Sequence, residues 1–275
     1  MILKASIRYS LTVLIIVALG FAAIMGAYLI PVDKIEQNAA ASAAVIADEG
    51  PYPDVYDFCT SRADNFTDAW IILMARDDTD SGLVDRAMSA HYQKAGNSNN
   101  GISLIYHYVM GEEYSGTLSY GRYWHGYMIF VKPLLTAFTY SQIRLINTIA
   151  QLLITALIVI VMLYTGVREL MIPYIISYLM MMPQVMGMCF NYSPCFYIMS
   201  LSVLLILMLR NSKWIYTGQL FLIIGMLTSY FDFLTFPLVT FGIPCLILTY
   251  LEIKSDDYTS GIKKTLISLI RRGIC

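Results

Sequence analysis

Charged residues are scarce in this chain: they make up 13% of its 275 residues, whereas 57% are hydrophobic. This balance excludes a soluble enzyme with an added anchor and indicates an integral membrane protein. P-loop, GxSxG and HExxH motifs do not occur, so soluble nucleotide chemistry is unsupported. The net charge of −1 gives no reason to expect a nucleic-acid partner.

Cysteine is also sparse, with five residues scattered along the chain. They form no CxxC pair and no Cys/His cluster, so no zinc site is predicted and the identity of any metal cofactor stays unknown. Cys189 and Cys195 fall near one predicted turn. There they either pair or act as ordinary small apolar residues.

The first long apolar run is Leu11–Ile30, which contains no charged residue. At about 1.5 Å per residue, a helix of this length crosses a hydrocarbon core of about 30 Å. A cleaved signal peptide is the alternative, because small residues follow at Ala39–Ala44. The run is longer than a usual signal-peptide core, and further apolar runs follow it. We therefore interpret residues 1–30 as a retained signal-anchor helix.

Residues 31–140 separate this helix from the later apolar runs, and they are acidic. Fourteen acidic and seven basic residues occur between Pro31 and Tyr140, whereas most other bases lie near the ends of apolar runs. With the N-terminus in the cytoplasm, the positive-inside rule places the short basic turns inside and residues 31–140 outside. Both termini are then expected to be cytoplasmic.

The later apolar runs predict a bundle of about five spans over residues 141–253. They are Leu145–Tyr164, Leu170–Phe190, Pro194–Leu209, Trp214–Ser229 and Phe236–Leu251. With the first helix, they predict an all-α integral membrane protein of about six transmembrane helices.

Two amphipathic segments are expected to lie along the membrane. Tyr127–Tyr140 predicts a helix on the outer surface, at the end of the external loop. Residues 254–275 predict a basic amphipathic tail on the inner surface. This tail stops without a clear terminus, so we expect the chain to be part of a longer protein.

The external loop carries the string DNFTDAW at Asp64–Trp70. On a helix, the spacing of Asp64 and Asp68 places both carboxylates on one face, where repulsion raises one pKa toward that of a useful base. Asp64 in front of an apolar run is also suited to cap a helix, with Asp68 in its first turn. Both interpretations stay open.

A second string, YGRYWHG at Tyr120–Gly126, places Arg122 and His125 among aromatic residues. This arrangement suits an anionic headgroup or a lipid phosphate at the interface. The alternative is an aromatic belt with a snorkelling arginine. A third string, YFDFLT at Tyr230–Thr235, holds the lone acid Asp232 between two spans. An acid there is either functional or part of a helix terminus.

These features together resemble the N-terminal half of the GT-C class of polytopic glycosyltransferases. The shared pattern is a helix that starts in the cytoplasm, a large external first loop with an aspartate-containing string, and closely packed later spans. The three strings are also similar to those of bacterial membrane proteins of cell-surface polysaccharide pathways. The resemblance implies transfer of a sugar from a polyprenyl-phosphate donor to a glycan or lipid acceptor at the outer face of the cell membrane.

The resemblance also implies roles for the singled-out residues. An acceptor hydroxyl displaces the lipid phosphate from the anomeric carbon, with Asp64 or Asp68 as the base. Arg122 and His125 hold the phosphate, and Asp232 positions the acceptor or a divalent metal. The competing class is a non-catalytic membrane protein: a transporter or flippase component, or an envelope assembly subunit.

Overall fold

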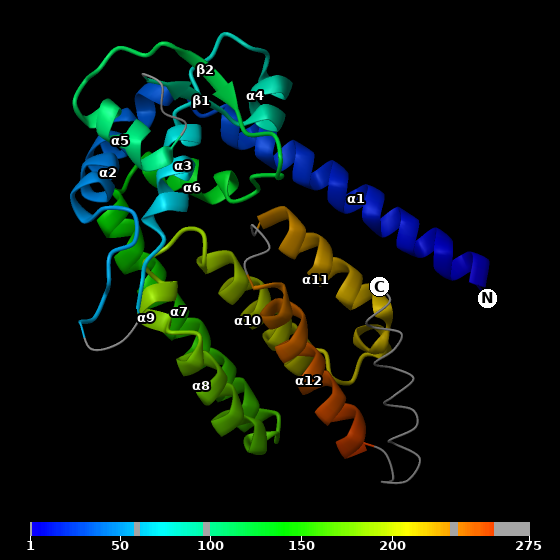
Figure 1. Cartoon of the computed structure of the whole chain (residues 1–275). Helices are drawn as coiled ribbons and strands as arrows, with labels where there is room; N and C mark the ends of the chain where they lie inside the picture. Colours follow the sequence, from blue (N-terminus) through cyan, green and yellow to red (C-terminus); the bar gives the residue numbers. More distant parts are fainter. Residues whose placement is uncertain (1, 58–60, 96–99, 232–235, 256–275) are drawn as a thin grey trace.

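The computed structural model describes residues 2–57, 61–95, 100–231 and 236–255, and these are mainly α-helical. They form two layers: a cap, built from residues 31–139, lies at one end of a set of longer apolar helices (Figure 1). The predicted all-α class is confirmed apart from a small two-stranded sheet in the cap. Asp232 and nearly all of the predicted tail lie outside the described residues.

The cap combines short helices with this sheet. In chain order its elements are η1 (Val32–Lys34), α2 (Glu36–Glu49), α3 (Asn65–Ala75), α4 (Leu83–Ser89), β1 (His91–Lys94), α5 (Gly101–Val109), β2 (Gly116–Ser119) and α6 (Met128–Leu135). The two strands pair antiparallel, with Tyr92 opposite Leu118. Helix α3 is the centre of this layer, because all its residues from Ile71 to Ala75 are buried.

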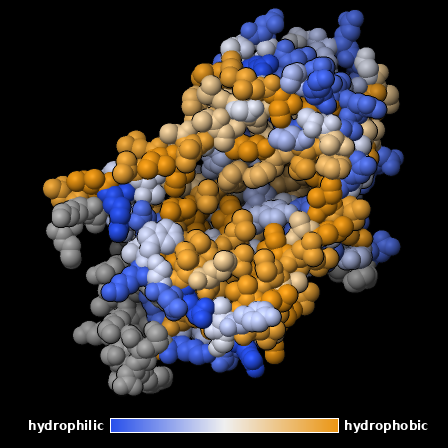
Figure 2. Space-filling view, turned by 180° about the vertical axis from the view of Figure 1, so that it is seen from behind, coloured by the Kyte–Doolittle hydropathy of each residue, from blue (hydrophilic) through white to orange (hydrophobic). Residues whose placement is uncertain are grey.

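The second layer holds the longer helices. Its elements are α1 (Ile2–Tyr28), α7 (Tyr140–Tyr164), η2 (Arg168–Leu170), α8 (Met171–Met180), α9 (Pro183–Met186), α10 (Ser193–Met208), η3 (Lys213–Tyr216), α11 (Gly218–Phe231) and α12 (Pro237–Ser255). Three stretches are long and apolar enough to cross a membrane: Ser6–Tyr28, Tyr140–Tyr164 and Pro237–Lys254. Figure 2 shows a band of hydrophobic side chains between hydrophilic ends, as expected for a protein seated in a bilayer.

The predicted span Leu170–Phe190 is not one continuous helix. It divides into η2, α8 and α9, and α8 with ten residues reaches only about 15 Å. The break lies at Met182, whose φ of 53° is left-handed, directly before Pro183. Proline disfavours the helical conformation in the residue before it, which explains the break. The broken segment still returns from the far end of α7 to the cap (Figure 1).

One hydrophobic core joins the cap to the second layer. Its buried members include Ile24 and Tyr28 of α1, Tyr140 of α7, and Phe190 after α9. A separate core fills the space among α7, α8, α10, α11 and α12. The cap therefore packs on the ends of the longer helices.

Helix α6 occupies the first part of the segment Tyr127–Tyr140, which was predicted as a surface helix. Its Lys132 is only 1% exposed and donates a hydrogen bond to the Ala75 carbonyl at 2.7 Å. Burial lowers the pKa of this amine to about 8. One side of α6 therefore packs into the cap, while Phe130 on the other side is exposed.

Candidate functional site

Two of the three strings singled out in the sequence meet at one cavity of about 220 Å³, here called the aromatic cavity. DNFTDAW contributes residues of α3, and YGRYWHG contributes residues of the loop between β2 and α6. Asn191, which follows α9, completes the wall. The lining residues are Phe66, Thr67, Trp70, Tyr120, Tyr123 and Asn191.

Trp70 is held in this cavity by close contacts with neighbouring residues. Its indole lies nearly parallel to the Tyr120 ring, with 6.1 Å between the ring centroids and 9° between the planes. The Tyr92 ring packs against the indole in a T-shaped arrangement, with 4.6 Å between the ring centroids. A Cβ atom at Gly101 would lie 2.9 Å from the Trp70 Nε1, so this position needs glycine for the indole to fit. The aromatic surface is thus held in place from two sides.

Asp64 lies beside this cavity at the start of α3. Its Oδ1 accepts a hydrogen bond from the Thr67 backbone N–H at 3.0 Å, so the predicted capping role is present. Its Oδ2 accepts from the Thr67 hydroxyl at 2.7 Å and from the Asn191 amide at 2.9 Å. Asp64 is half-buried, and both side-chain partners line the cavity. The Asp64 carboxylate therefore both caps helix α3 and borders the aromatic cavity.

Asp68 has no exposed surface. It accepts hydrogen bonds from the Tyr140 hydroxyl, from the Phe190 N–H at 2.8 Å and from the Asn191 N–H at 3.1 Å. Burial raises the pKa of this carboxyl to about 7, although the three hydrogen bonds act in the opposite direction. Asp68 thus anchors the backbone that carries Asn191.

A second buried group, Arg144, supports the same region. Its guanidinium forms an ion pair with Glu49 at 2.7 Å, and it donates to the Asn65 side chain at 2.8 Å and to the Met188 carbonyl at 2.9 Å. Burial acts to raise the pKa of Glu49, but the hydrogen bonds from Arg144 and Asn65 outweigh it and lower that pKa. This network joins α2, α3 and α7 to the segment after α9.

His125 and Arg122 have different surroundings. His125 is 1% exposed, with Nε2 against the Tyr120 carbonyl and Nδ1 against the Tyr127 hydroxyl. Because a carbonyl can only accept, Nε2 carries the proton and Nδ1 accepts from Tyr127. Burial lowers the pKa of His125 to about 4, which keeps the ring neutral. Arg122 is exposed, and its guanidinium lies 5.5 Å from the centroid of the Tyr123 ring.

Tyr230 brings the YFDFLT segment into contact with the YGRYWHG segment. The Gly126 N–H donates to the Tyr230 carbonyl at 3.0 Å, and the Trp124 and Tyr230 ring centroids are 5.8 Å apart. A Cβ atom at Gly126 would lie 2.4 Å from the Tyr230 ring, so only glycine allows this approach. The neighbouring Asp232 lies outside the described residues.

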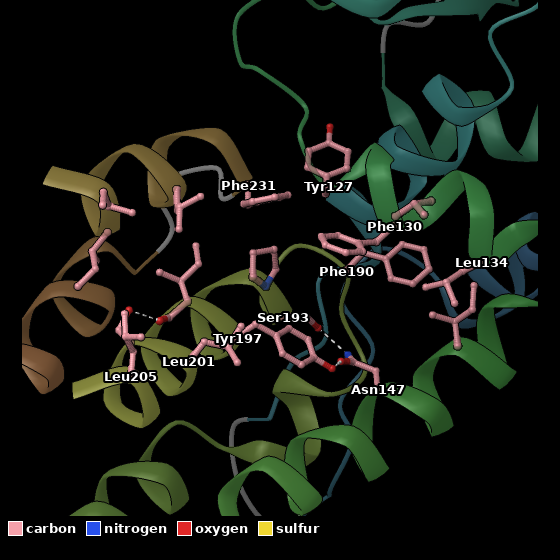
Figure 3. A pocket seen from close by; sticks show the side chains of 18 of the residues that line it. Tyr127, Phe130, Leu134, Asn147, Phe190, Ser193, Tyr197, Leu201, Leu205 and Phe231 are labelled. Carbon is pink, nitrogen blue, oxygen red and sulfur yellow. Dashed lines mark hydrogen bonds between the residues drawn. The ribbon is translucent and has the colours of Figure 1, made fainter. Parts of the chain in front are cut away.

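A second, larger cavity of about 500 Å³ is here called the apolar cavity (Figure 3). Helices α6, α7, α10 and α11 supply most of its wall, with Phe130, Leu201 and Phe231 among the labelled side chains. Its polar lining groups are engaged within the protein: Asn147 donates to Ser193 at 2.6 Å and accepts from Tyr197 at 2.7 Å. Ser202 donates to the Ile198 carbonyl, and the Tyr127 hydroxyl bonds to His125. The surface offered to an occupant is therefore hydrocarbon.

Two consecutive residues belong to the walls of different cavities. Phe190 lines the apolar cavity and Asn191 lines the aromatic one, and Asp68 binds the N–H groups of both. His125 makes a similar link, since Tyr127 lines the apolar cavity and Tyr120 the aromatic one. The walls of the aromatic and apolar cavities are therefore joined at Phe190–Asn191 and through His125.

Sequence reasoning missed several residues of this site. Neither Asn191 nor Arg144 was among the residues singled out from the sequence. A charge at the start of a long apolar run was a usable signal for Arg144, because such charges are costly unless paired. Nothing local in the sequence indicates that Asn191 meets Asp64.

Comparison with known proteins adds no family assignment. No protein-family model matches the chain, and neither do curated proteins or solved structures. Among the described residues, no group of three or more His, Cys, Asp or Glu side chains is placed to hold a metal ion. The fold defines a helical protein with membrane-spanning character.

Proposed function

We propose that this protein is a membrane-embedded glycosyltransferase that moves a sugar from a polyprenyl-phosphate donor to a glycan or lipid acceptor. The observation that carries the proposal is the pairing of the two cavities. One is aromatic and has a carboxylate beside it, the other is apolar, and one peptide unit separates Phe190 from Asn191. A lipid-linked sugar has the matching division into a polar head and a hydrocarbon chain.

In the proposed reaction, the acceptor hydroxyl attacks the anomeric carbon of the donor sugar. Asp64 takes the hydroxyl proton as the new C–O bond forms, and the bond from the anomeric carbon to the phosphate oxygen breaks. Polyprenyl phosphate leaves with both bonding electrons. We assign neutralisation of the charge on the phosphate to Arg122, which is next to the cavity-lining Tyr123.

Asp68 and His125 take supporting roles in this proposal. Asp68 holds the segment that carries Asn191, and His125 holds the loop that carries Tyr120. Both are buried and fully engaged with neighbouring groups. We assign them to positioning rather than to contact with the substrate. Asp232 stays a proposed ligand of the acceptor or a divalent metal.

We further propose six membrane crossings with both termini in the cytoplasm and the cap outside. Three crossings are the long helices α1, α7 and α12. Helices α10 and α11 are shorter and would cross where their ends pack against the cap or where the bilayer thins. The remaining crossing is the broken segment of η2, α8 and α9. Broken helices are tolerated at membrane depth where they are buried in protein.

The test separates the two roles of Asp64. Asparagine caps a helix about as well as aspartate, whereas alanine costs about 0.5–2 kcal/mol of stability. We expect Asp64→Asn to abolish transfer from a polyprenyl-phosphate sugar with a smaller loss of melting temperature than Asp64→Ala, because the amide keeps the helix cap but loses one of the two acceptor oxygens. Asp64→Ala should lower both. The assay uses the purified full chain in nanodiscs with a panel of donors, each carrying one radiolabelled sugar.

Two outcomes would contradict this proposal. Unchanged turnover in Asp64→Asn would remove Asp64 as the base. A wild-type protein that binds the donors but transfers no sugar from any of them would favour the non-catalytic class, a transporter or flippase component or an assembly subunit.

A further inference from the structure

We propose that the aromatic cavity binds the sugar ring itself and selects a neutral monosaccharide over an acidic one. This inference rests on the proposed function and adds the class of sugar. It depends on three properties of the cavity: its aromatic walls, its rigidity and the charge behind it.

The lining matches one pyranose ring. Four of the six lining residues are aromatic, and the other two, Thr67 and Asn191, are polar and neutral. One face of a pyranose ring presents C–H groups that pack on aromatic rings, while its hydroxyls need a few hydrogen-bond partners. A volume of about 220 Å³ is smaller than the usual site for a drug-sized ligand. It therefore suits a monosaccharide better than an oligosaccharide.

The aromatic wall is also preorganised. Tyr92 contacts one side of the Trp70 indole, and Gly101 leaves just enough room for it on α5. Ligand binding then costs little side-chain ordering. A rigid flat platform favours a ligand with a flat apolar face.

The charged group bonded to the lining side chains is negative. Thr67 and Asn191 both donate hydrogen bonds to the Asp64 carboxylate, which lies directly behind the wall. None of the described lining residues carries a positive charge. Arg122 lies against the Tyr123 ring, where we assign it to the phosphate. The carboxylate of a uronic or sialic acid would thus face like charge with no cation in the wall, which weakens its binding.

Saturation-transfer NMR on the full chain in nanodiscs tests this directly. The probes are methyl β-D-glucopyranoside, methyl β-D-galactopyranoside and methyl β-D-glucuronide. We expect saturation of the C–H protons on one ring face of a neutral glycoside. We also expect at least about tenfold weaker binding of the glucuronide. Equal binding of the glucuronide and the neutral glycosides would overturn the charge argument.

A pair of variants tests the location. Trp70→Leu should weaken binding of the neutral glycosides about tenfold. The control Trp214→Leu changes a tryptophan of η3, in the other core, and should leave binding unchanged. Should Trp70→Leu fail to fold, Tyr123→Leu removes another ring of the same wall and is expected to weaken binding similarly. Unchanged affinity in the folded variant would show that the sugar lies elsewhere.

The assay measures binding and not transfer, so the two proposals can fail separately. A protein that binds neutral glycosides in this cavity but transfers no sugar contradicts the glycosyltransferase proposal alone. A protein that transfers sugar while Trp70→Leu binds glycosides normally contradicts the sugar subsite alone.

Discussion

At the scale of single residues, Asp68 shows how a buried acid shapes a site without entering it. Its carboxylate accepts hydrogen bonds from two consecutive backbone N–H groups, those of Phe190 and Asn191. Those two residues face different cavities. A carboxylate can accept from both N–H groups at once, whereas an amide side chain turns its own N–H₂ toward one of them.

This geometry predicts the effect of Asp68→Asn. One backbone N–H loses its acceptor, which should cost about 1–3 kcal/mol of stability. Thermal unfolding of the purified protein measures the loss. Asp80→Asn, at an exposed acid of the same cap, serves as the control and should change little. Equal melting temperatures for the two variants would contradict the anchoring role.

The same residue predicts a pH dependence. The pKa of Asp68 is raised to about 7 in the folded protein, while an aspartate in the unfolded chain has a pKa of about 3.9. The folded state therefore binds the proton more tightly, and this contribution to stability is fully present below about pH 4 and is lost as the pH rises to 7. The stability advantage of wild type over Asp68→Asn should shrink across that range. A constant difference in melting temperature between pH 4 and pH 7 would contradict it.

At the scale of elements, the contact between the YGRYWHG loop and Tyr230 holds the cap against α11. Gly126 lies against Tyr230, with a backbone hydrogen bond between them. Tyr230 also donates to the Gly20 carbonyl of α1. The end of α11 is thus held between the cap and the first helix.

Gly126→Ala should disturb this contact. Its Cβ would overlap both the ring and the carbonyl of Tyr230, and overpacking of this kind costs roughly 1–3 kcal/mol. Gly121→Ala lies in the same loop, where the nearest atom to a new Cβ is an ordinary 3.4 Å away. We expect a lower melting temperature for Gly126→Ala only. Similar values for both variants would show that the contact with Tyr230 does not matter for stability.

Much of the helical pattern was predictable at this scale, because apolar runs and prolines are local signals. Leu145–Tyr164 falls within α7, and Asp64 caps α3 as the capping interpretation expected. The split of Leu170–Phe190 was harder to predict, because Pro173 lies inside α8 whereas Pro183 begins α9 after the break. The aromatic cavity could not be predicted, since it needs Asn191 to meet residues more than a hundred positions earlier.

At the scale of the whole molecule, the cap and the far ends of the long helices should lie on opposite sides of the membrane. Thr117 is exposed on β2 in the cap, and Asn211 is exposed in the turn after α10. In a cysteine-free background, Thr117→Cys should react with an impermeant maleimide added to intact cells. Asn211→Cys should react only after the membrane is opened. Labelling of both from the same side would contradict the proposed topology.

The core that joins the two layers also sets an order of events during synthesis. The cap is made of residues 31–139, yet its interior includes Tyr140, Ile143 and Phe190, and its ion pair to Glu49 comes from Arg144. These partners leave the ribosome only after the whole cap has done so. In the proposed topology, the cap therefore crosses the membrane with its interior incomplete and waits for α7 and the segment after α9 to be inserted. A nascent chain cut before residue 188 should expose apolar surface on the cap and become a target for chaperones and proteases on that side.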